Sequence, residues 1–312
     1  MVAETAVDGA LASAEATLAR ASWHAADFES PAAEARALLV SLLDVRRSWP
    51  MHHGDELLAP EIVDALRRAA EQRALGAPIQ YATGRAAFRH LTLEVDNRVL
   101  SPRPETEVLV DLALERCSGG TVVDVGTGSG CIALALASEG RFDRVIATDI
   151  SAGALSVACA NAERLCDSLR TPLEFRLGSL LAPLGGEQVR MVVSNPPYIA
   201  AAEADALPAL VRNWEPSIAL FSPADGMAHI TSLARDAASV LERGGWLLLE
   251  VDARRAQLAV ETVSAGGWYQ EVAVHRDLTG RERFVIARRR AADAVPNVTH
   301  VHAPAGAQSG AR

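Results

Sequence analysis

Four consecutive residues carry the clearest chemistry in this sequence: Asn195, Pro196, Pro197 and Tyr198. They follow an apolar run that ends at Val193. Because proline lacks the N–H that a strand ladder needs, the run is expected to be a buried strand that stops here. In open α/β sheets this carboxyl edge is where ligands bind. The pattern therefore predicts a site that presents Asn195 and Tyr198 to a ligand.

These residues suit recognition of a planar, uncharged nitrogen group. The side-chain carbonyl of Asn195 and the main-chain carbonyl of Pro196 can together accept both N–H bonds of an NH₂ group. The ring of Tyr198 offers a flat face for stacking. A carboxamide or an exocyclic base amine fits such a clamp. The alternative interpretation is a proline-rich turn after a strand, followed by an ordinary tyrosine.

A second candidate site is the glycine-rich turn Gly126-Thr127-Gly128-Ser129-Gly130. It separates a strand expected at 121–125 from a helix expected to begin at Cys131, so backbone N–H groups and a helix N-terminus can approach a ligand there. Asp149 ends the next expected strand, at the spacing of the acid that binds ribose hydroxyls in nucleotide-binding βαβ units.

Two cofactors fit that arrangement, a dinucleotide and S-adenosylmethionine. The spacing Gly-x-Gly-x-Gly differs from the G-x-G-x-x-G that is typical of dinucleotide sites. Asp124 precedes the turn, where an acid can lie near the amino group of the methyl donor. Both features favour S-adenosylmethionine.

The elements that would position these residues alternate between strand and helix, which implies a parallel sheet with right-handed crossovers and an α/β fold. Strands are expected at 121–125, 144–148, 173–177, 189–194 and 246–251, helices at 106–114, 131–138, 152–165, 227–241 and 254–265, and a closing antiparallel pair at 267–275 and 283–288.

The N-terminal region, residues 1–78, shows helical spacing and no convincing strand. Ser30 and Pro31 are typical of an N-cap and first turn, and Pro60 is expected to open another helix. The region serves either as packing support or as a docking platform for a macromolecular substrate. Residues 79–100 alternate like a β-hairpin connector, the domain with the candidate sites spans 101–290, and the tail 291–312 is expected to be disordered.

Composition narrows the class of protein. The chain has 312 residues, 49% hydrophobic and 22% charged, which is enough for two globular domains. A net charge of −9 argues against a protein that holds nucleic acid through its phosphates. Four cysteines without paired spacing indicate a reducing compartment and no metal site. With no signal peptide and no apolar run long enough to cross a bilayer, a cytoplasmic protein without membrane partners is expected.

The two motifs together, Asp124-Val125-Gly126-Thr127-Gly128-Ser129-Gly130 and Asn195-Pro196-Pro197-Tyr198, resemble those of class I methyltransferases that act on amide or amine nitrogen. Three further motifs make the chain, from about residue 10 to 290, similar to the peptide chain release factor N5-glutamine methyltransferases: Arg103-Pro104-Glu105-Thr106-Glu107, Asp225-Gly226-Met227 and Gly280-Arg281-Glu282-Arg283. The resemblance implies a helical N-terminal domain, a β-hairpin and a seven-stranded Rossmann-like sheet. It also implies the glutamine of the Gly-Gly-Gln loop of class 1 release factors as substrate.

The resemblance also implies roles for individual residues. The turn 126–130 would contact the methionine part of the donor, Asp149 and Ile150 the ribose and its surroundings, and residues 195–198 the glutamine amide. Asn195 would also border the donor. Arg103 and Glu105 belong to the implied substrate site, although they could equally cap a helix and face solvent. Ser179 and Leu180 replace the usual acid and aromatic, so adenine recognition would depend on backbone and apolar contacts.

The implied reaction is an in-line attack of the amide nitrogen on the sulfonium methyl group. Hydrogen bonds to Asn195 and Pro196 would hold that nitrogen near the methyl group, and the proton would leave after transfer. No base is clearly placed. A monomer is expected. The alternatives are N5-glutamine methylation of a ribosomal protein, adenine-N6 methylation of nucleic acid, and a non-catalytic module that binds S-adenosylmethionine.

Overall fold

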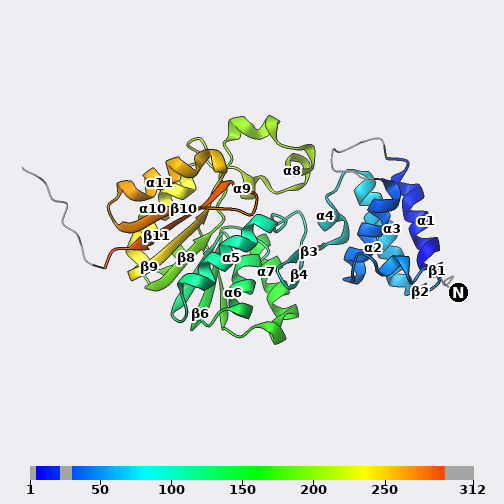
Figure 1. The fold of residues 1–312 in the computed structure, drawn as a ribbon, viewed down its shortest axis with the longest axis horizontal. Coiled ribbons are helices and arrows are strands. Elements are labelled where there is room, and N and C mark those ends of the chain that lie inside the picture. The colour runs from blue at the N-terminus through cyan, green and yellow to red at the C-terminus, as the bar shows by residue number, and fades with distance from the viewer. Residues whose placement is uncertain (1–4, 22–29, 292–312) are drawn as a thin grey trace, which may run out of the picture.

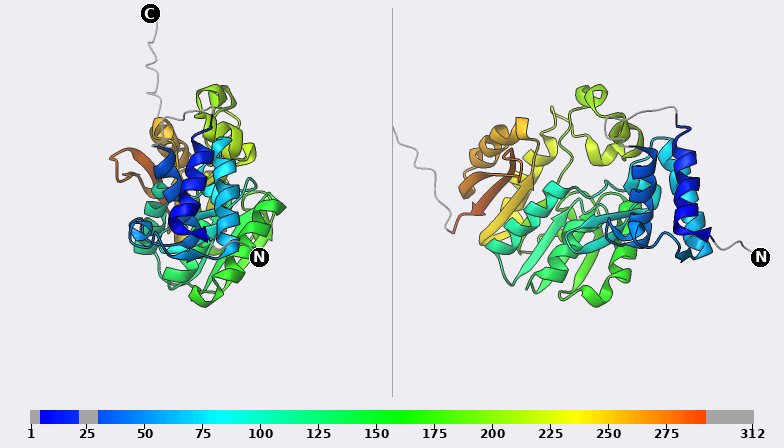
Figure 2. Two further views of the ribbon diagram at one scale, coloured as in Figure 1. Left: turned by 90° about the vertical axis from the view of Figure 1, so that its right-hand side faces the viewer. Right: turned by 45° about the vertical axis from the view of Figure 1, so that its right-hand side comes forward.

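The computed structural model describes residues 5–21 and 30–291. Figure 1 shows a small helical domain beside a larger domain built on one sheet, with a short connector between them. The right view of Figure 2 shows the same separation, whereas in the left view the helical domain lies in front of the larger domain, so the molecule is elongated along the line that joins the domains.

Within the described residues, the N-terminal domain is built mainly from three α-helices, α1 (Val7–Leu18), α2 (Pro31–Leu43) and α3 (Pro60–Ala74). The expected start of α2 is confirmed, because the Ser30 hydroxyl accepts a hydrogen bond from the Ala33 N–H at 3.2 Å. Leucines and alanines from all three helices share one buried core. Inside it, Arg73 donates to Glu34 at 2.6 Å and ties α3 to α2.

The expectation of no strand in this domain was wrong. Thr5–Ala6 (β1) pairs antiparallel with Leu57–Leu58 (β2). Two-residue strands contain no alternation of apolar and polar residues, so the sequence gives no periodic signal for them.

The connector contains the predicted hairpin, β3 (Arg85–Phe88) and β4 (Leu91–Glu94), preceded by a short helix that was not predicted, α4 (Ile79–Thr83). A fully buried side chain, Asn161, fastens the hairpin to the larger domain. It bonds both backbone groups of Glu94, at 2.7 and 2.9 Å, and donates to the Ser129 carbonyl at 3.0 Å.

The larger domain is built on a seven-stranded sheet in the order β10-β11-β9-β8-β5-β6-β7. The strands from β5 to β9 are parallel, and β11 lies antiparallel between β9 and β10. The strands are β5 (Thr121–Val125), β6 (Arg144–Asp149), β7 (Leu173–Leu177), β8 (Val189–Ser194), β9 (Leu241–Glu250), β10 (Tyr269–Arg276) and β11 (Glu282–Arg289). The α/β fold with a seven-stranded sheet is therefore confirmed.

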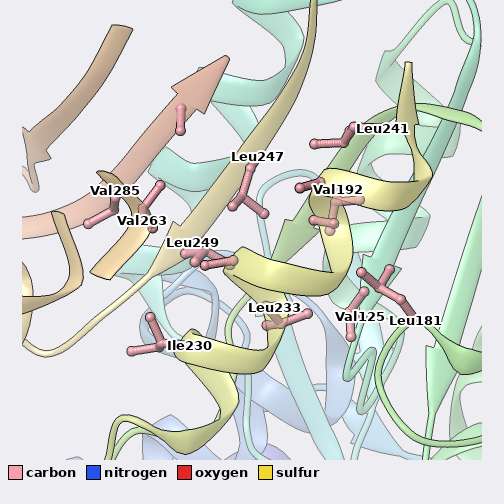
Figure 3. Packing of buried hydrophobic residues seen from close by; sticks show 14 of the residues in the cluster. Val125, Leu181, Val192, Ile230, Leu233, Leu241, Leu247, Leu249, Val263 and Val285 are labelled. Atoms are coloured by element: carbon pink, nitrogen blue, oxygen red, sulfur yellow. The ribbon is translucent and has the colours of Figure 1, made fainter. Parts of the chain in front are cut away.

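Helices cover both faces of this sheet. One face packs against α5 (Pro104–Arg116), α6 (Cys131–Glu139) and α7 (Ala152–Arg164), and the other against α10 (Ala228–Val240) and α11 (Ala256–Ala265). Figure 3 shows the second interface, where Ile230 and Leu233 of α10 lie against Val192, Leu247 and Leu249 of the sheet. Apolar burial on both sides explains why the central strands read as continuous hydrophobic runs.

Short helices complete the chain, including a segment after β8 that the sequence did not predict. They are η1 (Trp49–Met51), η2 (Cys166–Ser168), η3 (Ala182–Leu184), η4 (Ala201–Ala206), α8 (Ala209–Trp214), α9 (Ser217–Leu220) and η5 (Ala253–Arg255). The predicted disordered tail lies outside the described residues, except for Ala291. Across the described ranges, no helix is both long and apolar enough to cross a membrane, and no cluster of three potential metal ligands occurs.

Candidate active site

A cavity of about 230 Å³ lies at the carboxyl ends of β5, β6 and β8. Parallel strands bring their carboxyl ends to one edge, so segments far apart in sequence meet there. Its walls include most of the predicted donor-site residues: Gly126, Thr127, Gly128, Ser129, Asp149, Ile150, Ser179, Leu180 and Asn195.

The glycine turn forms the floor of this cavity. Gly126 and Gly128 adopt φ angles of +73° and +56°, a left-handed backbone that side chains with a Cβ rarely adopt. The N–H groups of Gly126 and Thr127 bond to the Thr148 carbonyl at 2.8 and 3.0 Å. The turn is thereby held against the end of β6, with the N-terminus of α6 directly behind it.

Asp149 faces the same cavity from the end of β6. One carboxylate oxygen accepts from the Gly128 N–H at 2.9 Å and the other from the Ser151 N–H at 2.8 Å. A carboxylate offers about four lone-pair sites, so both oxygens keep capacity for ligand hydroxyls. Ile150 and Ile218, which are more than half exposed, add apolar surface to the cavity wall. This combination of acceptors and apolar surface fits a nucleoside.

The loop after β7 supplies another wall through Ser179 and Leu180. Leu180 has a φ of +49°, which is strained for a leucine. Its carbonyl accepts from the Thr148 hydroxyl at 3.0 Å, which fixes this conformation. At Gly178, an added Cβ would lie 2.6 Å from the ring of Pro183, so the loop requires glycine there.

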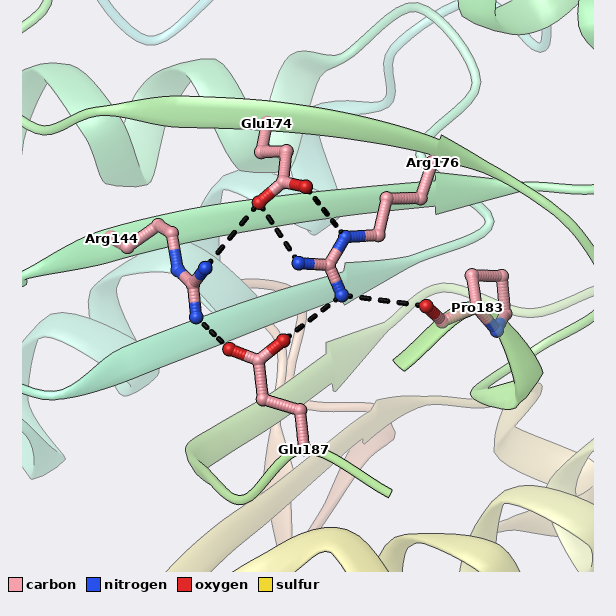
Figure 4. Close-up of polar contacts among 5 residues, drawn as sticks. All are labelled: Arg144, Glu174, Arg176, Pro183 and Glu187. Atoms are coloured by element: carbon pink, nitrogen blue, oxygen red, sulfur yellow. Dashed lines mark hydrogen bonds and ion pairs between the residues drawn. The ribbon is translucent and has the colours of Figure 1, made fainter. Parts of the chain in front are cut away.

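An ion-pair network braces this loop from outside the cavity (Figure 4). Arg176 bonds Glu174 on its own strand, Glu187 at 3.0 Å and the Pro183 carbonyl at 3.4 Å. Arg144 of β6 bonds Glu187 as well. All four charged side chains are partly exposed, so each pair contributes little alone and the network acts by restricting the loop.

A second cavity, of about 320 Å³, adjoins the first. Asn195, Pro196 and Pro197 line both cavities and therefore form the wall between them, while Tyr198 lines the second alone. The segment after β8 encloses this space with apolar residues, among them Ile199, Leu207, Val211 and Leu220. The predicted clamp therefore lies between two adjacent spaces.

Asn195 is held by a hydrogen-bonded chain that ends in a buried acid. Its side-chain NH₂ donates to the Thr106 hydroxyl at 3.2 Å, and Thr106 donates to Glu250 at 2.8 Å. Glu250 ends β9, is only 1% exposed, and has its pKa raised to about 7 by burial. The carbonyl oxygen of Asn195 has no hydrogen-bond partner within residues 5–21 and 30–291.

The two predicted substrate residues outside the clamp are placed differently. Arg103 lines both cavities, and its guanidinium is ion-paired with the buried Glu215. Burial raises the pKa of Glu215, which the charge of Arg103 opposes. Glu105, in the first turn of α5, lines neither cavity.

Two predicted donor residues also lie outside the cavity lining. Gly130, at φ +85°, is the N-cap of α6 and packs toward Leu134 and Ala158. Asp124 is fully buried behind the turn, where one oxygen accepts from Thr127 at 2.6 Å and from the Ala133 N–H at 3.1 Å. Its other oxygen is unpartnered within the described chain. Burial raises the pKa of Asp124 to about 7.

Sequence reasoning missed Thr106 and Glu250 as site residues. An available signal was an ionisable residue at the end of the apolar run 246–249, because an acid there marks the ligand edge of a buried strand. Phe221 and His229, which line the first cavity, come from the unpredicted segment and from α10. Neither has a sequence pattern that points to the site.

Family models and curated relatives agree with this arrangement. A model described as the PrmC N-terminal domain matches residues 10–84, and one described as the methyltransferase small domain matches 104–213. Release factor glutamine methyltransferases of Moorella thermoacetica and Deinococcus radiodurans are both 40% identical to this chain. The matches cover 84% and 83% of this chain and 93% and 92% of the relatives. The relative from Xylella fastidiosa is 40% identical over 82% of this chain and 92% of its own length. The chain therefore belongs to the release factor glutamine methyltransferase family.

Proposed function

We propose that this protein transfers the methyl group of S-adenosylmethionine to the side-chain amide nitrogen (N5) of the glutamine in the Gly-Gly-Gln motif of class 1 release factors. The observation that carries the proposal is the free carbonyl oxygen of Asn195 at the wall between two cavities. A methyltransferase needs a donor and an acceptor on opposite sides of one reacting point, and this wall provides that geometry.

The first cavity fits the donor. Asp149 would accept the ribose hydroxyls, and the turn 126–130 would lie against the methionine part at the N-terminus of α6. Ile150 and Leu180 supply apolar surface for adenine, with Ser179 as a neutral polar partner. When bound, S-adenosylmethionine supplies an electrophilic methyl group on a sulfonium.

The second cavity fits the acceptor glutamine. Asn195 and Pro196 accept the two N–H bonds of its amide, which fixes the plane of the nitrogen and increases its electron density. The Pro196 carbonyl accepts no backbone hydrogen bond in the described part of the chain. Tyr198 and Pro197 cover the amide with apolar surface, which excludes water. Orientation of this kind can remove several kcal/mol of a barrier.

Proton removal does not require a nearby base. Glu203, on the wall of the second cavity, is engaged by the Ala200 N–H and by Arg254 and Arg255, and these contacts hold the pKa of this carboxyl below its usual range. Until it loses a proton, the nitrogen that has accepted the methyl group would carry the positive charge of the former sulfonium and would be far more acidic than the amide itself, so this proton would pass to water.

The other parts of the chain complete the proposal. The helical domain, residues 1–78, would dock the release factor, with residues 79–100 as its connector to the catalytic domain. The protein would act as a cytoplasmic monomer, with no direct contact to nucleic acid.

The test uses purified protein, labelled S-adenosylmethionine and a class 1 release factor, beside a copy with the Gly-Gly-Gln glutamine changed to alanine. The proposal expects label on the first protein and none on the second. Label on both would contradict the assigned acceptor, and label on a ribosomal protein or nucleic acid alone would contradict the assigned substrate. Donor binding without any transfer would indicate a binding module.

A further inference from the structure

The hydrogen bonds that link Asn195, Thr106 and Glu250 have a fixed donor-to-acceptor direction. A carboxylate only accepts hydrogen bonds, and a hydroxyl has a single proton to donate. Because Glu250 takes the proton of Thr106 at 2.8 Å, the oxygen of Thr106 can only accept on its other side. The amide atom that lies 3.2 Å from it must then be the NH₂ of Asn195.

That direction decides which end of Asn195 faces the acceptor. With its NH₂ committed to Thr106, the amide presents its carbonyl to the cavities. If the amide rotated by half a turn, an NH₂ group would meet the N–H bonds of the acceptor, and two donors would oppose each other. These hydrogen bonds therefore exclude the orientation of the Asn195 amide that would repel a glutamine amide.

Glu250 is also unusual in its surroundings. It is 1% exposed and forms no ion pair within residues 5–21 and 30–291, although Arg283 and Arg103 lie near enough to influence it. An unpaired buried carboxyl is costly, and an apolar residue would suit the end of a buried strand better. A carboxylate that costs stability at this position fits a role in orienting Asn195.

We propose that Glu250 and Thr106 are positioning residues that fix the amide of Asn195 with its carbonyl toward the acceptor. The proposal rests on the proposed function, since it specifies how that acceptor site is kept in its productive form. Thr106 comes from the first turn of α5 and Glu250 from the end of β9, so three elements cooperate in one orientation.

The same chain makes the orientation depend on pH. Glu250 faces Thr106, Glu105 and Arg103 from the α5 region, Arg283 from β11, Tyr198 after β8 and Cys131 of α6. With its pKa near 7, it is ionised above that value and protonated below it. A protonated Glu250 can donate to Thr106, which then donates to Asn195 and reverses the chain. Methyl transfer is therefore expected to fall as the pH drops through about 7.

The experiment compares Glu250→Gln, Thr106→Val and Thr106→Ser with the unchanged protein, using a release factor as acceptor. The first two variants should lose about tenfold to a hundredfold in kcat, the scale of a misplaced reacting group. Their dissociation constant for S-adenosylmethionine should be unchanged by calorimetry. Thr106→Ser keeps the hydroxyl and should restore most of the activity. Glu242→Gln makes the same change at the other end of β9 and should have no effect.

The pH profile gives a readout that a purely structural role would not change. The acidic limb of kcat near pH 7 should be present in the unchanged protein and absent in Glu250→Gln. Full activity in Glu250→Gln, or Thr106→Ser as inactive as Thr106→Val, would overturn the proposal. An inactive unchanged protein that still binds the donor would instead contradict the proposed function, so the two failures are distinguishable.

Discussion

The proposed donor side and the proposed acceptor side of the site are built in opposite ways. The donor side is mostly backbone: the turn 126–130 and the end of β6 lie close in sequence and bond through main-chain groups and Asp149. The acceptor side is made by side chains from distant elements, with Thr106 linking Asn195 to Glu250. A site made of backbone groups tolerates most substitutions other than those of its glycines and its acid. A series of hydrogen-bonded side chains is instead broken by the substitution of any one residue in it.

Asn195→Ala is expected to have the largest effect. It removes an acceptor for the substrate amide and leaves the Thr106 hydroxyl without its donor. Methyl transfer should fall by about 10²- to 10³-fold, the scale for one preorganised polar group, while donor binding changes little. Single-turnover assays measure methyl transfer, and calorimetry measures donor binding. Asn97→Ala is the control, because Asn97 is an exposed asparagine that lines neither cavity. A matching loss of donor binding would show that the two sides are not separate.

Gly226→Ala tests how rigidly residues 195–198, which include the wall between the two cavities, are held. Gly226 has a φ of +87°, and an added Cβ would lie 2.2 Å from the Tyr198 carbonyl oxygen and 2.7 Å from Nε of Arg255. The backbone that carries Tyr198 must shift, so kcat should fall by about a hundredfold. The donor dissociation constant should stay within about twofold. Gly280→Ala, at φ +82° with open space around it, controls for backbone strain alone. Equal losses in both variants would attribute the effect to strain.

Asp149→Ala tests the donor side. Loss of hydrogen bonds to a charged group should weaken donor binding by about 1.5–3 kcal/mol. The acceptor side should be unaffected, so kcat at saturating donor should stay near that of the unchanged protein. Calorimetry against Asp167→Ala, an exposed aspartate, provides the comparison. An unchanged dissociation constant would remove Asp149 from the donor site.

Glu250→Gln is expected to lower methyl transfer but to raise the stability of the fold by a small amount. Burial raises the pKa of Glu250 from 4.5 to about 7, so the folded state prefers the protonated acid. Stability is therefore lost as the pH rises from 4.5 through 7, and the full cost is present above 7. Glu250→Gln should raise Tm by a few degrees at pH 8 and hardly change it at pH 4.5. A lower Tm at pH 8 would show that the charge of Glu250 stabilises the fold.

The same contrast explains how far the sequence could predict the structure. The glycine turn, Asp149 and the segment 195–198 are contiguous patterns with local causes, and the strands around them were found to within a residue or two. Strand β9 begins at Leu241, five residues before its expected start, because Gly244 and Gly245 interrupt the apolar pattern.

The rest depends on contacts that no local pattern records. Thr106 looks like a first-turn helix residue, and its link to Glu250 spans 144 positions. The segment after β8 folds into three short helices without a period long enough to detect. Asp124 has the residue type expected of a donor ligand, yet the fold buries it behind the turn and uses it to hold Thr127 and Ala133.

Asn161 has a mechanical consequence. Its side chain joins three segments through hydrogen bonds: the connector hairpin at Glu94, the glycine turn at Ser129, and helix α7, which carries Asn161 itself. The hairpin cannot shift relative to the glycine turn without breaking at least one of these hydrogen bonds. The connector hairpin and the floor of the first cavity therefore form one rigid unit within the larger domain.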